Sequence, residues 1–142
     1  MFTRLIWDKA RPDLHYQHIT QNTGDVKAVA FLKNQYQKCR EEHSKCQRLA
    51  PYNDFVPTRA IYVGSVGEQV VRLCDSVEMI AGASYAVLSH CWGKTPQRIM
   101  LTKSTVGMLK EGIALSSLPK TFRDAVAVTR IFQIQYIWID SL

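Results

Sequence analysis

Residues 117–141 read SLPKTFRDAVAVTRIFQIQYIWIDS, and they set the class of fold. A helix is predicted over 118–132, because Ser117 can cap its N-terminus and Pro119 falls in the first turn, where proline is tolerated. A strand is predicted over 136–141, where β-branched and aromatic residues follow one another. One face of the helix is apolar and consists of Leu118, Phe122, Ala125, Thr129 and Phe132. The helix should therefore pack on a sheet to which the strand belongs.

Another strand is predicted over residues 85–91, YAVLSHC, whose first half is continuously apolar, as in a strand that is covered on both faces. Strand 85–91, helix 118–132 and strand 136–141 follow in the order of a βαβ unit, so the two strands should be parallel neighbours. The predicted fold class is α/β, with this βαβ unit in a parallel sheet.

Two elements are expected before the βαβ unit. A β-hairpin is predicted over 59–75, since RAIYVG and QVVRLCD flank a short connection that contains glycine. A helix is predicted over about 26–43, with Asp25 as its N-cap and apolar residues three and four positions apart. The chain thus divides into residues 1–57, an irregular arm plus a helix, and residues 58–142, the α/β part.

The composition excludes several classes of protein. The net charge is +6, yet the basic clusters are interrupted by acids, as in KCREEHSK (38–45), and no nucleic-acid-binding motif is present, so we expect no nucleic-acid partner. The N-terminus has no signal-peptide pattern and no segment approaches about 18 apolar residues, so we expect no membrane span. These features predict a cytoplasmic protein whose four cysteines are thiols.

Three motifs point to a known family. YAVLSHCWG (85–93), GIALSSLPKTFRDAVAVTR (112–130) and YIWIDSL (136–142) occur in an order and spacing that resembles the fungal heterokaryon incompatibility (HET) domain. The upstream PTRAIYVG (57–64) and VVRL are similar to the segment that often precedes this domain. In the family the pattern continues beyond this point, so the resemblance implies the N-terminal part of the domain only, from a truncated product. Gln133 stands where the family usually has a glycine.

The resemblance implies a module of fungal self/non-self recognition and programmed cell-death signalling, a form of innate defence. Such a module would act through protein partners, among them a second copy bound through the exposed sheet edge. The HET family is also distantly similar to TIR domains, which share the βαβ order. Some TIR domains cleave NAD with a glutamate on a later helix, and no residue of this sequence matches that glutamate.

Two alternatives to the signalling role remain open. The first is a TIR-like enzyme that binds or hydrolyses NAD, with its catalytic acid supplied from outside this chain. The second is an inactive fragment, because half of an α/β domain leaves a hydrophobic parallel strand unpaired and buries little apolar surface. Of these three possibilities, we expect the signalling role rather than enzymatic activity.

The adjacent Ser89, His90 and Cys91 look like a nucleophilic site. A nucleophile and its base must lie about 3 Å apart. Successive side chains of a strand point to opposite faces, so Ser89 and Cys91 should share one face while His90 lies on the other. We therefore assign no catalytic residue.

A ligand pocket is the more specific hypothesis for this region. Ligands of open α/β sheets bind outside the carboxyl ends of the parallel strands. Both predicted strands end in polar residues, and Trp92 could stack on a planar group. The alternative is structural, with Ser89 and Trp92 fixing the turn and Cys91 packing as a small hydrophobe. We expect no cofactor, and NAD is the ligand that the TIR similarity suggests. The candidate ligand-binding residues are Ser89, His90, Trp92, Gly93, Asp140 and Ser141.

A second cluster of chemically active residues is Cys39, His43 and Cys46, at positions i, i+4 and i+7. Cysteine and histidine are the usual ligands of zinc. Three ligands spread over seven residues of a straight helix diverge too far to reach one metal, unless the helix breaks near Ser44. Packing of the helix face is the alternative. We assign no metal, and the three residues stay a candidate set that requires such a break.

Overall fold

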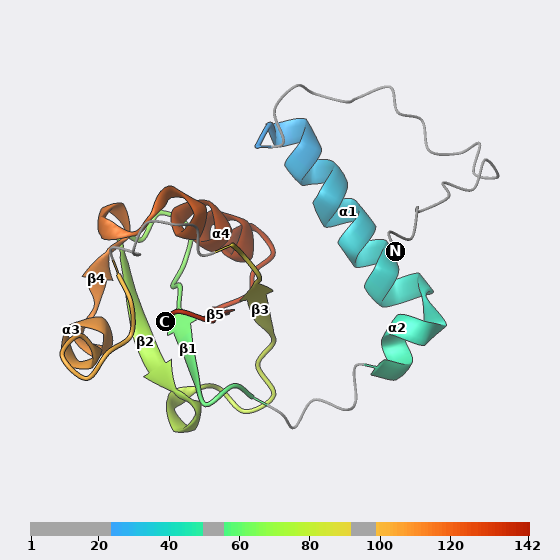
Figure 1. Ribbon diagram of the computed structural model, residues 1–142. Helices are drawn as coiled ribbons and strands as arrows, with labels where there is room; N and C mark the ends of the chain where they lie inside the picture. The colour runs from blue at the N-terminus through green and yellow to red at the C-terminus, as the bar shows by residue number, and fades with distance from the viewer. Residues whose placement is uncertain (1–23, 50–55, 92–98) are drawn as a thin grey trace, which may run out of the picture. The chain divides into compact units, whose positions relative to one another are not determined.

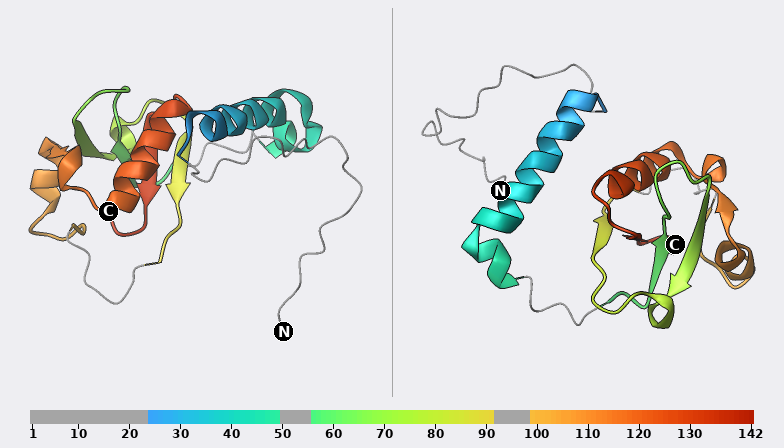
Figure 2. Two further views of the ribbon diagram at one scale, coloured as in Figure 1. Left: turned by 90° about the horizontal axis from the view of Figure 1, so that it is seen from above. Right: turned by 180° about the vertical axis from the view of Figure 1, so that it is seen from behind.

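The structure is a computed structural model that describes residues 24–49, 56–91 and 99–142. The chain forms two compact units, Met1–Gln47 and Arg48–Leu142, which are considered separately. The helices and strands of both units are shown in Figure 1 and, from two further directions, in Figure 2. Within the described ranges, none of the helices combines the length and the apolar character that crossing a bilayer requires.

The first unit contains helix α1, Val26–Glu42, and most of the short helix α2, Ser44–Leu49. Asp25 caps α1, since its carboxylate accepts a hydrogen bond from the Lys27 amide at 2.8 Å. The helix predicted over 26–43 stops one residue early, because His43 has an extended backbone with φ −91° and ψ 99°. α1 buries none of its residues, so the apolar face predicted from its spacing is not packed into a core.

The second unit is built on a five-stranded sheet in the order β3-β5-β1-β2-β4 (Figure 1). The strands are β1 (Arg59–Tyr62), β2 (Val70–Asp75), β3 (Tyr85–Leu88), β4 (Ile113–Ala114) and β5 (Tyr136–Ile139). The helices are α3 (Val106–Glu111) and α4 (Lys120–Ile131), and the 3₁₀ turns are η2 (Ser76–Glu78) and η3 (Leu115–Ser117). The unit therefore has the α/β class that the sequence predicts.

β3 and β5 are parallel neighbours in register, with Tyr85 opposite Tyr136 and Leu88 opposite Ile139, and α4 connects them. This confirms the predicted βαβ unit. β1 pairs antiparallel with both β2 and β5, and β2 pairs antiparallel with β4. The expectation of a parallel sheet was therefore wrong, because the hairpin adds its first strand to β5. β5 becomes an interior strand, and β3 is the outer strand at that side of the sheet.

The main core lies between α4, α3 and one face of the sheet (Figure 1). Phe122 and Val126 of α4 are fully buried and share a cluster with Ile137 and Ile139 of β5. Leu109 joins this cluster from α3. Leu118, Phe122 and the partly buried Ala125 of the predicted apolar stripe pack in this core, as the 3.6-residue period requires. Val126, which the prediction did not include, is buried with them.

Arg130, near the end of α4, is buried and ties the helix to the β1–β2 connection. Its Nε donates to the Val63 carbonyl at 2.7 Å and its Nη1 to the Glu68 carbonyl at 2.8 Å. Nη2 also donates to the Val63 carbonyl. A planar guanidinium with five donors suits this task, because several backbone acceptors converge on one side chain.

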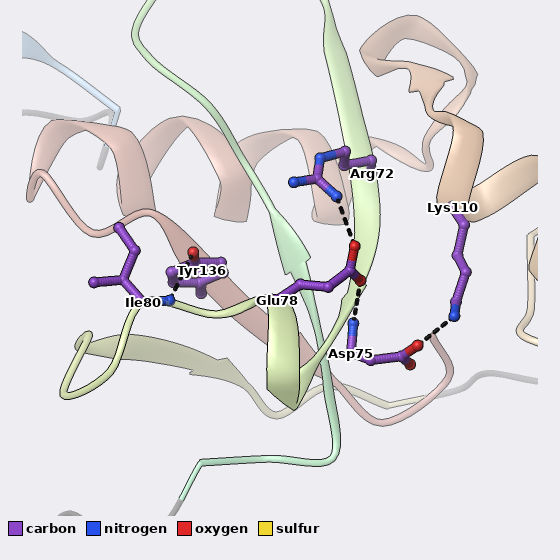
Figure 3. A network of polar contacts seen from close by, with 6 residues as sticks. All are labelled: Arg72, Asp75, Glu78, Ile80, Lys110 and Tyr136. Carbon is purple, nitrogen blue, oxygen red and sulfur yellow. Dashed lines mark hydrogen bonds and ion pairs between the residues drawn. The ribbon is translucent and has the colours of Figure 1, made fainter.

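The opposite face of the sheet is partly covered by the segment after β2. Met79 is buried there with Ala60 and Tyr136. The Tyr136 hydroxyl accepts a hydrogen bond from the Ile80 amide at 3.3 Å, which attaches the segment to β5 (Figure 3). Trp138, in the carboxyl-terminal half of β5, is not part of this second, smaller cluster.

Polar contacts fix the start of the same segment and the position of α3. Glu78 accepts a hydrogen bond from the Asp75 amide at 2.8 Å and pairs with Arg72 at 3.5 Å (Figure 3). The Lys110 ammonium of α3 contacts the Asp75 carboxylate. This hydrogen bond raises the pKa of Lys110 above its ordinary value. Since these side chains are exposed, the contacts orient the elements more than they stabilise them.

Candidate functional site

The carboxyl ends of β3 and β5 lie side by side because the two strands are parallel and in register. His90 follows β3 by two residues and Asp140 follows β5 by one. The distance between His90 Nδ1 and Asp140 Oδ1 is 3.5 Å. This separation suits an ion pair when the imidazole is protonated, and it is long for a hydrogen bond. The structure thus brings two of the predicted residues together at one edge.

The His90 ring points toward α4. It packs edge-on against Phe122, with ring centroids 5.0 Å apart and an interplanar angle of 89°. Its side chain is only 10% exposed, whereas Ser89 and Cys91 are exposed. β3 ends at Leu88, so these three residues follow the strand rather than belong to it.

Ser141 is a buried polar residue of this edge, with 5% of its surface exposed. Its carbonyl accepts a hydrogen bond from the Leu101 amide at 2.9 Å, which fixes the backbone after β5. Its hydroxyl is buried and has no hydrogen-bond partner among the residues that the structure describes. A buried hydroxyl without a partner is costly, and a ligand or water that reaches it would recover this free energy.

A cleft of about 630 Å³ begins at this edge and extends over the sheet. The volume falls within the range of ligand pockets, about 300–1,000 Å³. Tyr85, Val87 and Trp138 contribute to it from β3 and β5, on the face opposite the main core. The remaining lining residues are Pro57, Thr58, Arg59, Met100, Leu101, Asp140, Ser141 and Leu142.

Trp138 lines the cleft together with a second aromatic residue, Tyr85, and sequence reasoning selected neither. The alternation of side chains along a strand could have identified Trp138. Ile137 and Ile139 face the main core, so Trp138, which lies between them, faces the opposite side of the sheet. Arg59 gave no such signal, because it reaches the cleft only through the antiparallel pairing of β1 with β5.

The structure places the predicted ligand-binding residues differently with respect to the cleft. Asp140 and Ser141 line the cleft, and His90 contacts Asp140. Ser89 is exposed and is not among the residues that line the cleft. Trp92 and Gly93 lie outside the described residues. Trp138 is a further aromatic side chain on which a planar group could stack.

The chemistry of the cleft favours binding. Trp138 and Tyr85 offer aromatic surface, on which a planar group can stack. The Arg59 guanidinium can bind a phosphate or carboxylate through paired hydrogen bonds. Asp140 and the Ser141 hydroxyl can fix the orientation of a polar group. A planar molecule that carries an anionic group matches this arrangement.

The candidate metal ligands Cys39, His43 and Cys46 belong to the first unit. Their ligand atoms lie within 4.8 Å of one another. The helix break that the sequence argument required is present, at His43. The three side chains therefore form a compact group.

Comparison with protein families finds a match in the second unit. Residues 85–142 match the family described as Heterokaryon incompatibility protein (HET). No curated protein and no solved structure matches the chain. The matched segment begins with β3 and contains α4 and β5, so it includes the βαβ unit and both strand ends that form the candidate site.

Proposed function

We propose that this chain, whose residues 85–142 match the heterokaryon incompatibility (HET) family, is a cytoplasmic signalling module of fungal self/non-self recognition that promotes programmed cell death. The observation that carries the proposal is the family match over the βαβ unit. In this proposal the cleft at the ends of β3 and β5 senses a small ligand, and protein partners receive the signal.

The position of the site supports a sensing role. The cleft residues Asp140 and Ser141 directly follow β5, while Arg59 belongs to the antiparallel hairpin. A ligand in the cleft would contact both the HET segment and the hairpin before it. Its binding energy would then couple these two parts of the sheet.

The proposal is tested by inducible expression of the full chain in a filamentous fungus, with a viability dye as readout. We expect induced cells to die, and we expect Asp140→Asn to reduce killing strongly because it removes the carboxylate that faces His90 and the cleft. Asp124→Asn is the matched control, since Asp124 is also an exposed aspartate but pairs with Lys120 on α4.

Two results would contradict the proposal. One is full viability of cells that contain the soluble, folded chain, which would favour an inactive protein. The other is equal killing by the wild type and the Asp140 variant, which would exclude a role for the cleft.

The cleft supports a second candidate function, the binding of NAD or a related nucleotide. Trp138 can stack on a base, and Arg59 can bind a phosphate. This function differs from the first because it requires only a small molecule. The catalytic acid for NAD cleavage would have to come from elsewhere.

Calorimetric titration of the full chain with NAD, with chromatography of the products, tests this second function. We expect binding that weakens at least about 10-fold in Arg59→Gln, the loss expected for one charge-assisted contact. Arg123→Gln is the control, because Arg123 on α4 donates to the Ser116 carbonyl of η3 and is not among the residues that line the cleft. Absence of binding removes the nucleotide proposal, and turnover that Trp138→Leu abolishes would make the chain an enzyme.

A further inference from the structure

The Cys39, His43 and Cys46 side chains form a cluster with the dimensions of a metal site. The Cys39 and Cys46 Sγ atoms are 3.1 Å apart, and all three ligand atoms lie within 4.8 Å of one another. In a tetrahedral zinc centre, Zn–S bonds of about 2.3 Å and Zn–N bonds of about 2.0–2.1 Å place the ligand atoms roughly 3.5–3.8 Å apart. Small side-chain rotations would therefore bring the three atoms around one ion.

The helix break makes this convergence possible. In an uninterrupted helix, the Cα atoms of Cys39 and Cys46 would be about 10 Å apart along the axis. Instead, α1 ends at Glu42, His43 is extended, and α2 starts at Ser44. The turn at His43 carries the first residues of α2 back toward the end of α1, so that Cys46 reaches Cys39.

A disulfide is the other chemistry that two neighbouring cysteines allow. The Sγ–Sγ distance of 3.1 Å is well beyond the S–S bond length of about 2.05 Å, and both cysteines are free. The presence of His43 beside the pair also adds a ligand that a disulfide does not need.

A metal ion could stabilise the corner between α1 and α2. α1 buries none of its residues, so no apolar core among the described residues fixes the corner between α1 and α2. Cys39 is half-buried, while His43 and Cys46 are exposed and accessible to ions from solution. In small domains that lack a core, a structural zinc supplies folding free energy directly.

We propose that Cys39, His43 and Cys46 bind one Zn²⁺ ion, with a water molecule as the fourth ligand, and that the ion fixes the corner between α1 and α2. Binding converts both thiols to thiolates, whose protons pass to solvent, and uses a neutral imidazole nitrogen of His43. The site lies in the first unit and does not depend on the function proposed for residues 85–142.

Titration of the reduced full chain with Co²⁺, a coloured substitute for zinc, tests the proposal. We expect a thiolate-to-cobalt charge-transfer band and the strong visible absorption of a four-coordinate ion, saturating at one ion per chain. Added Zn²⁺ should remove both signals. Cys39→Ser, Cys46→Ser and His43→Ala should each weaken cobalt binding at least about 100-fold, since loss of even an outer-shell partner costs about 10–100-fold.

Cys91→Ser is the matched control, because Cys91 is an exposed free cysteine of the second unit, and it should leave the titration unchanged. Thiol alkylation gives a second readout. Zn²⁺ should protect Cys39 and Cys46 but not Cys91. The proposal is overturned if the wild-type chain gives no cobalt spectrum, or if the spectrum survives in Cys39→Ser and Cys46→Ser.

Discussion

Gln133 shows how one residue carries local strain at the end of α4. Its backbone has φ 58°, in the left-handed region, and it is the only non-glycine residue with a positive φ among those that the structure describes. Its amide donates to the Arg130 carbonyl at 2.9 Å, which closes the last turn of the helix. The HET resemblance places Gln133 where the family usually has a glycine, and glycine adopts this left-handed conformation without strain.

Gln133→Gly should stabilise the second unit by about 0.5–1 kcal/mol. Removing left-handed strain gains about 1–2 kcal/mol, and the greater entropy of glycine in the unfolded chain offsets part of that gain. Urea denaturation measures the difference. Gln135→Gly, at an exposed position with ordinary φ, is the control and should destabilise the unit. Equal effects of the two substitutions would show that Gln133 is not strained.

Arg130 is the residue with the largest expected effect on stability. Arg130→Met should destabilise the second unit by about 2–4 kcal/mol, because it removes three hydrogen bonds and leaves the Val63 and Glu68 carbonyls without this donor. Arg123→Met on the same helix removes one bond to the Ser116 carbonyl and should cost below about 1 kcal/mol. Thermal and urea unfolding of both variants measures the loss of stability in each. Losses of similar size would contradict the anchoring role of Arg130.

At the scale of elements, Gly112 controls the passage from α3 to β4. Its φ of 118° lies in a region that is essentially confined to glycine, and an added Cβ would lie 2.9 Å from Val70 Cγ1. Gly112→Ala should therefore destabilise the unit by about 1–3 kcal/mol.

Gly107 inside α3 provides the comparison for Gly112. It has no positive φ, and a Cβ there would meet no atom within 4 Å. Gly107→Ala should stabilise the unit by up to about 1 kcal/mol, through helix propensity. Unfolding midpoints of both variants test the pair, and a neutral Gly112→Ala would show that the α3–β4 turn adapts.

β3 is the element through which a protein partner or a second copy could bind. It is the outer strand of the sheet among the described residues, and Val87 on it is 59% exposed. Unpaired edges of this kind favour association. We expect concentration-dependent self-association in sedimentation experiments, and Val87→Lys should abolish it. Val77→Lys, at another exposed valine in η2, should leave it unchanged. A wild-type chain that stays monomeric throughout would exclude this edge as a contact between copies.

At the scale of the whole molecule, stability resides in the second unit. Both core clusters consist of residues from 56 onward, whereas α1 has no buried residue. A fragment of residues 48–142 should therefore unfold cooperatively, with a free energy of unfolding within about 0.5 kcal/mol of the same unit in the full chain. Intrinsic tryptophan fluorescence during urea unfolding provides the measurement. A markedly weaker fragment would show that residues 1–47 contribute to the stability of the sheet.

The sequence by itself determined the local elements and the βαβ unit. Phe122 and Val126 lie four residues apart, at helical spacing, and Ile137 and Ile139 lie two residues apart, at strand spacing, so each element has its own buried face. These periodicities depend on neighbours in the chain and can be read without coordinates.

Only the tertiary structure decided how the hairpin joins the sheet and what lines the cleft. Pairing of β1 with β5 made the sheet mixed, brought Arg59 to the cleft and turned β5 into an interior strand. The break at His43 likewise brought Cys46 to Cys39. Strand pairing and chain reversal depend on which surfaces, distant in the sequence, bury one another. The spacing of apolar residues along one segment does not identify the segment on which it packs.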